Sequence, residues 1–418
     1  MKRIAAAFAV PVLGLLLAPS ALAAETIRYL ALVDGGKQAG QQVVVHGDDG
    51  TTRSEFVFKD NGRGPELKEE YTLAPDGTLR TYRITGTSTF GAKVDESFRA
   101  ADGKATWKST SDAGEQPLRP GAMYSPLSGT PQVSSVTIAA LATRADGKLP
   151  LIPSGTLSMR KVDEAEVSRG GQRRKVQLLQ VTGVGFTPSF AWFTQDRTPR
   201  LFAFIFPGFL QLVEDGWQAN AGALETRQKA AEGKALVDMQ QRLAHPVAGS
   251  LLVRNARVFD SATATLGAAS DVLVRGGKVV SVVPAGQGEA KAGQVIDAGG
   301  KVMLPGLFDM HAHFDRWSGG LQLAAGVTSV RDMGNDNATL QQAMAEERAG
   351  TLLAPRIVPA GFIEGESKQS ARNGYVVKDL AGAKEAVDWY AAHGYPQIKI
   401  YNSFPKDILK DTVAYAHA

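Results

Sequence analysis

Apolar and polar residues alternate in short runs from about residue 25 to 217, and turn-forming residues separate the runs. A period of two is typical of strands that bury one face of a sheet. Asp-Gly pairs stand between several runs and indicate hairpins, as in TLAPDGTLRTYRITG, ESFRAADGKATWKS and ATRADGKLPLI. We therefore predict an antiparallel β-rich domain over residues 24–219, built as a curved meander or half-open barrel.

The last part of this region is strongly apolar and predicts two strands within SFAWFTQDRTPRLFAFIFPGFLQLVEDGW. We expect these strands to bury five aromatic side chains, namely Phe190, Trp192, Phe202, Phe204 and Phe206. A packed core explains such a set, and a ligand cavity lined by the same rings is the alternative.

Two shorter segments follow. Residues 220–246 place Leu224, Leu236 and Leu243 at roughly helical spacing, which predicts a linking helix that ends before Pro246. Residues 247–304 return to short strands with Gly-Gly pairs at the turns, and we predict a small β-sandwich portion there.

From residue 305 onward, strands and helices alternate. Apolar strands are expected near residues 308, 329, 358 and 399, and the helices between them begin at an Asn or Thr near residue 337 and at Asp379. This alternation predicts parallel β/α units, so residues 305–418 are expected to form the first half of a (β/α)8 TIM-type barrel. A half barrel leaves a sheet edge and a core uncovered, and we therefore expect the 418 residues to be the front part of a longer chain.

The amino-terminal residues predict export. Lys2 and Arg3 precede an apolar run from residue 4 to 18, and Ala21-Leu22-Ala23 matches a cleavage pattern. Residues 1–23 are thus predicted to be a signal peptide, which places the chain in the periplasm or outside the cell without a stable membrane anchor after cleavage. A retained anchor is the alternative, although the run is short for a membrane span.

Composition narrows the chemistry. The chain has no cysteine, which excludes a lipid-modified amino-terminal cysteine, disulfides and thiolate metal sites, so a metal would need nitrogen or oxygen ligands. The formal net charge of +4 is small and comes from residues of mixed sign along the chain. This balance gives no indication of nucleic acid as a partner.

Candidate metal ligands stand at the end of the first predicted barrel strand. Asp309, His311 and His313 are spaced by two, so their side chains share one face of a strand. Imidazole suits zinc, iron, cobalt or nickel, and a carboxylate such as Asp309 is the usual partner that fixes the imidazole tautomer. Such a His-x-His pair also occurs on ordinary exposed strands, and the motif alone leaves that alternative open.

The fourth strand carries a lysine between two isoleucines, Ile398 and Ile400. Lys399 must face the side opposite to them, and inside a barrel its ammonium group would be driven toward the neutral amine, which can capture carbon dioxide as a carbamate. The alternative is a lysine that reaches the strand end and keeps its charge. Near the second strand, Arg331 and Asp332 are expected to form a buried strand-end pair.

The motifs occur in an order that resembles the amidohydrolase superfamily. They are LLVRNARVFD, DVLVRGGKVVSVVP, VIDAGGKVMLPGLFDMHAHFD, AAGVTSVRDMG and HGYPQIKIY. The resemblance covers about residues 249–418, and it is greatest to exported imidazolonepropionase-like and Xaa-Pro dipeptidase-like members.

This resemblance implies a metal-dependent hydrolase of C–N bonds. His311 and His313 would be metal ligands, and a carboxylated Lys399 would bridge one or two divalent metal ions, zinc being the expected ion. A metal-bound hydroxide would attack an amide, a cyclic amide or a dipeptide, so the substrate is expected to be a small molecule or dipeptide. The family takes further ligands from later strands, so the catalytic half is expected to be incomplete in these 418 residues. The alternative is a catalytically inactive exported fragment, or a binding protein that uses its N-terminal β domain.

Overall fold

The computed structural model describes residues 25–418 apart from residues 34, 290 and 372. The predicted signal peptide, residues 1–23, lies outside the described residues. The described chain forms two compact units. Unit 1 comprises residues 25–58, 64–157 and 194–218, and unit 2 comprises residues 59–63, 158–193 and 219–418. The predicted domain boundaries at 219, 246 and 304 stay a prediction.

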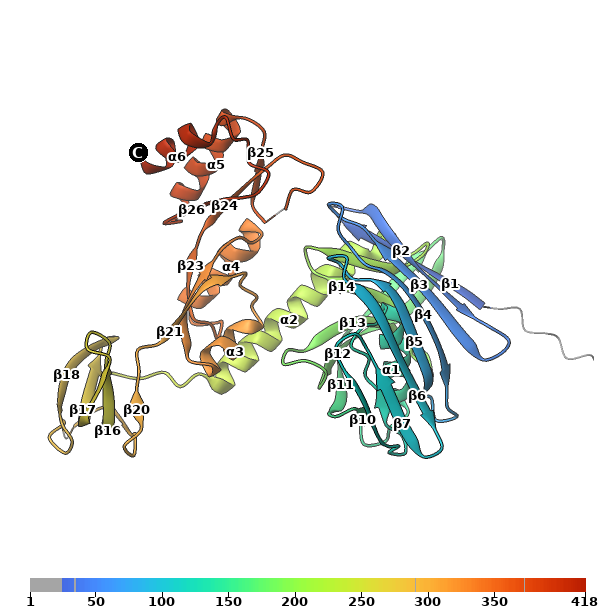
Figure 1. The fold of residues 1–418 in the computed structure, drawn as a ribbon, viewed down its shortest axis with the longest axis horizontal. Coiled ribbons are helices and arrows are strands. Elements are labelled where there is room, and N and C mark those ends of the chain that lie inside the picture. Colours follow the sequence, from blue (N-terminus) through green and yellow to red (C-terminus); the bar gives the residue numbers. More distant parts are fainter. Residues whose placement is uncertain (1–24, 34, 290, 372) are drawn as a thin grey trace, which may run out of the picture. The chain divides into compact units, whose positions relative to one another are not determined.

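Unit 1 contains a long antiparallel sheet in the strand order β8-β7-β6-β5-β4-β3-β2-β1-β15-β14 (Figure 1). The strands are β1 (Glu25–Val33), β2 (Lys37–His46), β3 (Thr51–Phe58), β4 (Glu66–Leu73), β5 (Leu79–Thr87), β6 (Lys93–Ala101), β7 (Lys104–Lys108), β8 (Ala113–Pro117), β14 (Leu201–Phe206) and β15 (Leu210–Glu214). Strictly alternating burial along β3 and β4 matches the period of two in the sequence. The predicted antiparallel meander is thus confirmed for this part of the chain.

Turn chemistry fixes the register of these hairpins. Strands β6 and β7 are joined by Asp102 and Gly103, whose φ angles of 52° and 72° are those of a tight two-residue turn. Between β4 and β5, Gly77 also has a positive φ of 80°. Both Asp-Gly turns lie where the sequence predicts them.

One predicted strand of this region is a helix instead. α1 (Pro131–Ala142) begins at Thr130, whose side chain accepts a hydrogen bond from the backbone N–H of Gln132. The run before the third Asp-Gly pair is therefore a helix, and its prediction as a strand is wrong, because Thr130 and Pro131 favour a helix start. The turn itself is present, since Gly147 has a φ of 64°. The strand after that turn is β10 (Lys148–Ile152), which pairs in parallel with β9 (Met123–Tyr124).

The predicted aromatic core is correct in part. Phe190 and Trp192 on β13 (Ser189–Thr194) and Phe202 on β14 are buried, whereas Phe204 is half-buried. Phe206 is 58% exposed, so its predicted burial is wrong. It is the last residue of β14 before the turn at Gly208, where its ring contacts only the edge of Phe209 among the described ring pairs.

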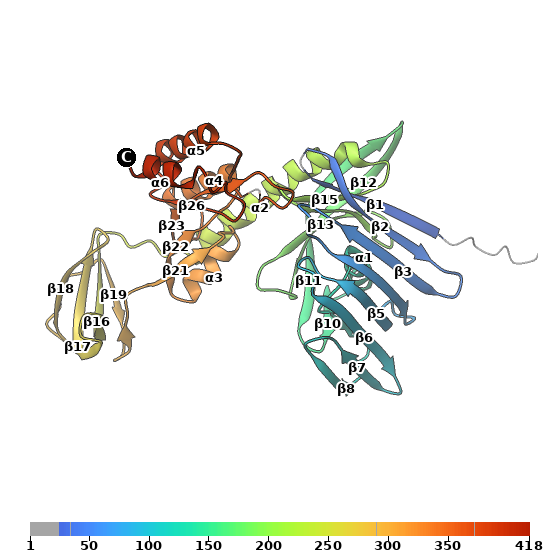
Figure 2. The ribbon, with the colours of Figure 1, turned by 45° about the horizontal axis from the view of Figure 1, so that its top comes forward.

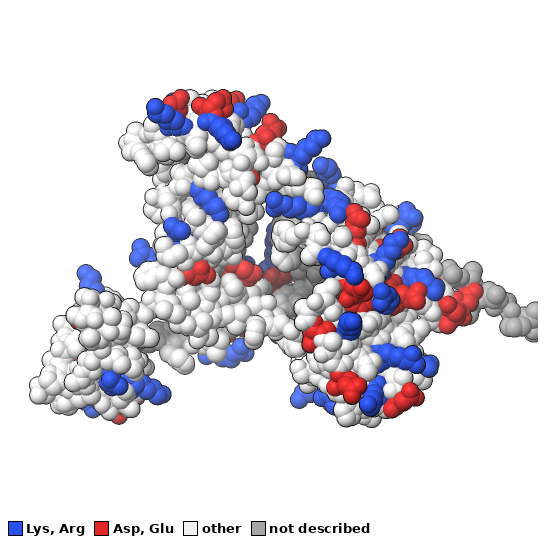
Figure 3. Space-filling view, viewed as in Figure 1, with Lys and Arg blue, Asp and Glu red and all other residues white. Residues whose placement is uncertain are grey.

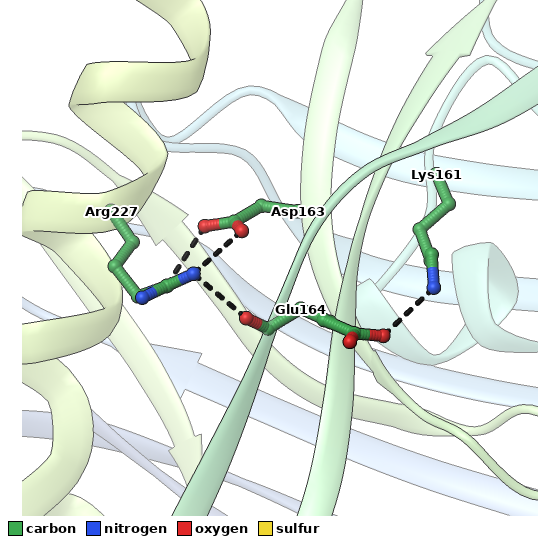
Figure 4. Close-up of polar contacts among 4 residues, drawn as sticks. All are labelled: Lys161, Asp163, Glu164 and Arg227. Carbon is green, nitrogen blue, oxygen red and sulfur yellow. Dashed lines mark hydrogen bonds and ion pairs between the residues drawn. The ribbon is translucent and has the colours of Figure 1, made fainter.

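In unit 2, a long helix lies where the linking helix is predicted. α2 (Ala221–Leu243) is held against β11 (Thr156–Arg169), which pairs with β12 (Gln172–Thr182). Arg227 donates to both carboxylate oxygens of Asp163 at 2.8 and 2.6 Å and to the carbonyl oxygen of Glu164 at 2.9 Å (Figure 4). Lys161 pairs with the carboxylate of Glu164 on the same strand.

The segment predicted as a small sandwich forms a single five-stranded sheet. Its strands are β16 (Ser250–Asp260), β17 (Thr265–Arg275), β18 (Lys278–Pro284), β19 (Gln294–Asp297) and β20 (Val302–Met303). Asp271 is buried there and accepts hydrogen bonds from the backbone N–H groups of Asn255, Gly286 and Gly288, which lower the pKa of its carboxyl group. The face of this sheet visible in Figure 3 carries few charged side chains.

The remainder of unit 2 alternates strands and helices (Figure 2). The elements are β21 (Leu307–Ala312), α3 (Ser318–Ala324), β22 (Val327–Asp332), α4 (Asn337–Arg348), β23 (Arg356–Pro359), β24 (Gly361–Gly365), β25 (Tyr375–Val377), α5 (Leu380–Ala392), β26 (Ile398–Ile400) and α6 (Leu409–His417). β22 pairs in parallel with β21 and β23, and β24 pairs in parallel with β25 and β26. Parallel β/α units are present, and their place in a TIM-type barrel stays a prediction.

Two local predictions in this region need correction. The strand expected near residue 358 is divided into β23 and β24, since the backbone N–H of Ala360 bonds to Asp332 and that of Gly361 bonds to Gln397. α4 is capped by Asp336, which accepts from the N–H of Thr339 at 2.9 Å, rather than by an Asn or Thr. The expected cap of α5 at Asp379 is confirmed.

Within unit 2, an apolar cluster joins α2 to the β/α part. Leu236 of α2 packs with residues of the β/α part, among them Phe314, Val330, Ile363 and Tyr390. Within the residues described, no helix is both long and apolar enough to cross a membrane.

Candidate functional site

The two predicted histidine ligands lie at the end of β21. His311 is near the end of that strand and His313 follows it, and both are exposed on the sheet. Their ring centroids are 5.6 Å apart, with the ring planes inclined at 56°. The two imidazoles are therefore close enough to face a common ion.

Lys399 comes to the same place from a distant part of the chain. It lies on β26, 88 residues beyond His311, and its Nζ is 3.4 Å from Nε2 of that histidine. The ammonium group lies over the rings of Phe362 and Tyr401, at 5.6 and 5.1 Å from their centroids. The structure thus brings together His311, His313 and Lys399.

The environment of Lys399 lowers the pKa of its amino group. Burial lowers the pKa of its amino group, the nearby carboxylate of Asp332 opposes this effect, and Arg331 adds to it. The side chain has lost water on the ring side but still has access to solvent, as its half-buried state indicates.

Asp309 contacts the backbone of its own strand, and its predicted role beside the metal ligands stays a prediction. Its carboxylate accepts a hydrogen bond from the backbone N–H of His311 at 3.1 Å, which is a local turn contact. The ring of His313 is instead held by a backbone group, because its Nδ1 lies 2.6 Å from the carbonyl oxygen of Gly334. For His313, the group that fixes the imidazole tautomer is thus a backbone carbonyl, where a carboxylate is expected from the sequence.

Arg331 and Asp332 do not behave as the predicted pair. Arg331 donates from Nε to the carbonyl oxygen of Met310 at 2.7 Å. Asp332 is fully buried, and its carboxylate accepts from the backbone N–H groups of Phe314 and Gly334. The predicted pair is wrong because backbone N–H groups of the adjacent loops bind the carboxylate of Asp332. A local sequence pattern does not show these contacts.

Sequence reasoning missed two further groups at these strand ends. Gly334 holds His313, and the buried Glu364 of β24 accepts from the N–H of Ser403 at 2.7 Å, just beyond β26. The sequence indicates these two residues only by position, because glycine and polar residues at the ends of buried parallel strands often belong to the functional sites of β/α folds.

These residues could provide nitrogen and oxygen ligands. Two imidazoles, together with a carbamate formed on Lys399, would suit a divalent metal such as zinc, which accepts both kinds of ligand. Among the residues that the structure describes, no group of three or more His, Asp and Glu side chains is placed to hold a metal ion. Lys399 would therefore have to complete the set that the histidines begin.

The chain is similar to dihydroorotases over a limited length. It is 43% identical over 100 residues to the dihydroorotase of Streptococcus thermophilus (strain CNRZ 1066), a match that covers 22% of this chain and 23% of that enzyme. It is 37% identical over 111 residues to the dihydroorotase of Streptococcus pyogenes serotype M3, covering 23% of this chain and 26% of that enzyme. The match thus spans about a quarter of the length of these relatives. No family model matches the chain.

Similar solved structures include a bottromycin amidohydrolase, at 22% identity with a TM-score of 0.36, covering 44% of this chain and 39% of that one. A Xaa-Pro dipeptidase with bound methionine in its active site has 18% identity and a TM-score of 0.35, covering 40% of this chain and 54% of that one.

Proposed function

We propose that this chain acts as a metal-dependent hydrolase of C–N bonds, and its local identity with dihydroorotases, enzymes of the amidohydrolase superfamily, supports this proposal. The observation that carries this proposal is the meeting of Lys399 with His311 at the strand ends, 3.4 Å apart across 88 residues of chain. Residues so distant in sequence converge on one point with the ligand chemistry that a divalent metal needs.

In this proposal His311 and His313 hold the metal through their imidazoles. A carbamate formed on Lys399 would supply oxygen ligands for one or two divalent ions, with zinc as the expected ion, and would act as a bridge if two are bound. The bound metal would supply a Lewis acid that polarises the scissile carbonyl and acidifies water. Asp309 supports the site through the backbone of His311.

The protein's own side chains prepare the surroundings. The rings of Phe362 and Tyr401, whose centroids are 4.8 Å apart, lie beside the Lys399 nitrogen and reduce its contact with water on that side. A desolvated amine is the form that captures carbon dioxide, so the aromatic cover suits the proposed bridge.

We propose a small substrate, either a cyclic amide such as dihydroorotate or a dipeptide with a Xaa-Pro bond. The first follows from the sequence relatives, and the second from the motif resemblance. The signal-like amino terminus supports a site of action in the periplasm or outside the cell.

The test is hydrolysis of both substrate types by the zinc-loaded 418-residue chain. His311→Ala and Lys399→Ala should each lower the rate at least about 100-fold, because each removes a metal ligand. His393→Ala is the matched control, since this histidine lies at the end of α5 with its ring stacked on Trp389. Hydrolysis that is equal in His311→Ala and wild type would refute the proposal. A folded chain without activity or bound zinc would favour the binding-protein alternative.

A further inference from the structure

We propose that Asp332 is a positioning residue that sets the tautomer of His313 through the turn of residues 332–335. The inference rests on the proposed metal site, because it assigns a role to that tautomer. Its structural basis is a chain of contacts from the buried carboxylate, through the turn, to the imidazole ring.

The first contact is between Asp332 and two backbone segments. Its Oδ2 accepts from the N–H of Phe314 at 2.7 Å, and its Oδ1 accepts from the N–H of Gly334 at 3.0 Å. The side-chain amide of Asn335 donates to the same Oδ2 at 3.2 Å and to the carbonyl oxygen of Phe314 at 2.8 Å. Both backbone groups of the residue that follows His313 are therefore tied to one carboxylate-centred turn.

The second contact decides the tautomer. Nδ1 of His313 lies 2.6 Å from the carbonyl oxygen of Gly334. A carbonyl oxygen can only accept a hydrogen bond, so Nδ1 must carry the proton. In the neutral ring this leaves the lone pair on Nε2, the nitrogen that is then free to bind a metal.

The geometry of the turn leaves the carbonyl little freedom. Gly334 has a φ of 138°, a backbone conformation that residues other than glycine rarely adopt. A Cβ at this position would lie 2.6 Å from the ring of Phe362, the same ring that faces Lys399. Both observations explain why glycine stands here, where the backbone places the carbonyl oxygen against His313.

A charged carboxylate suits this task better than an amide. Asp332 is 0% exposed, and each of its two oxygens accepts at least one N–H. An asparagine would offer one oxygen and point an N–H group at the remaining N–H donor. Asp332→Asn should therefore loosen one half of the turn and free the Gly334 carbonyl from its fixed direction.

The experiment reads the tautomer in the metal-free 418-residue chain, labelled with ¹⁵N-histidine. Long-range ¹H–¹⁵N correlation spectra at pH 8 should show His313, assigned with His313→Ala, protonated at Nδ1 in the wild type. In Asp332→Asn both tautomers should be populated, and the affinity for zinc should fall about 10- to 100-fold.

Glu364→Gln is the matched control. Glu364 is likewise a buried strand-end carboxylate that accepts backbone N–H groups, but its partners are Gly365 and Ser403. This variant should lose the same charge and leave the His313 tautomer unchanged. An unaltered tautomer in Asp332→Asn, or an equal change in Glu364→Gln, would overturn the inference. A clear Nδ1–H tautomer in a chain that binds no zinc would refute the metal site instead, so the two failures are distinguishable.

Discussion

The buried carboxyl group of Glu69 should make the stability of unit 1 depend on pH. Glu69 lies on β4, is 2% exposed and accepts hydrogen bonds from the hydroxyl of Tyr82 at 3.0 Å and from the N–H and hydroxyl of Thr130 at 2.9 and 3.1 Å. Burial raises the pKa of Glu69 from 4.5 to about 7, although these hydrogen bonds limit the rise. Glu69 thus lies in the interior next to the start of α1, and its carboxyl group is mainly protonated below pH 7.

The direction of the effect follows from proton binding. Between pH 4.5 and about 7 the folded chain holds a proton that the unfolded chain has released, so the free energy of unfolding falls as pH rises. The contribution is fully present below pH 4.5 and is lost as pH rises through about 7. At about 1.4 kcal/mol per pH unit, the interval corresponds to about 3 kcal/mol.

Glu69→Gln should remove this dependence without disturbing the contacts. Its Oε1 can accept from Tyr82 and from the Thr130 N–H, while its Nε2 donates to the Thr130 hydroxyl, which can turn toward Ser54 at 3.2 Å. We expect the variant to match the wild type within about 1 kcal/mol at pH 5 and to exceed it by about 2–3 kcal/mol at pH 8. Urea unfolding followed by circular dichroism measures this, with hydrogen exchange of β4 peptides identifying the transition.

Glu70→Gln is the matched control, because Glu70 is the next residue, is exposed, and pairs only at the surface with Arg53. It should change stability by less than about 1 kcal/mol, equally at both pH values. A wild type as stable as Glu69→Gln at pH 8, or a difference that does not change with pH, would refute the reasoning.

Two further predictions concern packing in unit 2. Leu236→Ala, at a 1% exposed position in the cluster that α2 shares with the β/α part, should cost about 2–5 kcal/mol in urea unfolding, and a cost below 1 kcal/mol would show that α2 does not support that core. Glu346→Gln should lower the free energy of unfolding by about 1–2 kcal/mol, because Arg316 donates to both carboxylate oxygens at 2.9 and 2.7 Å in a pair only about one-fifth exposed. An unchanged stability, or an equal loss of stability in an Arg316→Met background, would contradict this account.

The regular elements of the fold were predictable where one local signal dominates. Alternation and Asp-Gly turns predicted the meander, since a period of two and a tight turn leave few other structures. α1 begins at Thr130 and Pro131, but the apolar residues after them also fit the strand pattern of this region, so the pattern alone does not distinguish the helix. Phe206 was misplaced because its exposure depends on what covers the strand end, and a sequence pattern does not contain that information.

The candidate site was predictable only in the three residues proposed as ligands. His311, His313 and Lys399 were identified from spacing and motif order, and the structure places them together. The contacts that orient them were not predictable, because Gly334 and Asp332 act through hydrogen bonds that depend on how two parallel strands end side by side. Such contacts link residues about 20 positions apart and leave no periodic trace.

The most direct test of the account is the zinc content of the 418-residue chain after equilibrium dialysis, measured by mass spectrometry of the metal. The account predicts that the wild type and His393→Ala retain at least one zinc ion, whereas His311→Ala and His313→Ala lose it while remaining folded. Zinc retained equally by all four proteins, or absent from the folded wild type, would contradict the claim that these strand ends form a metal site.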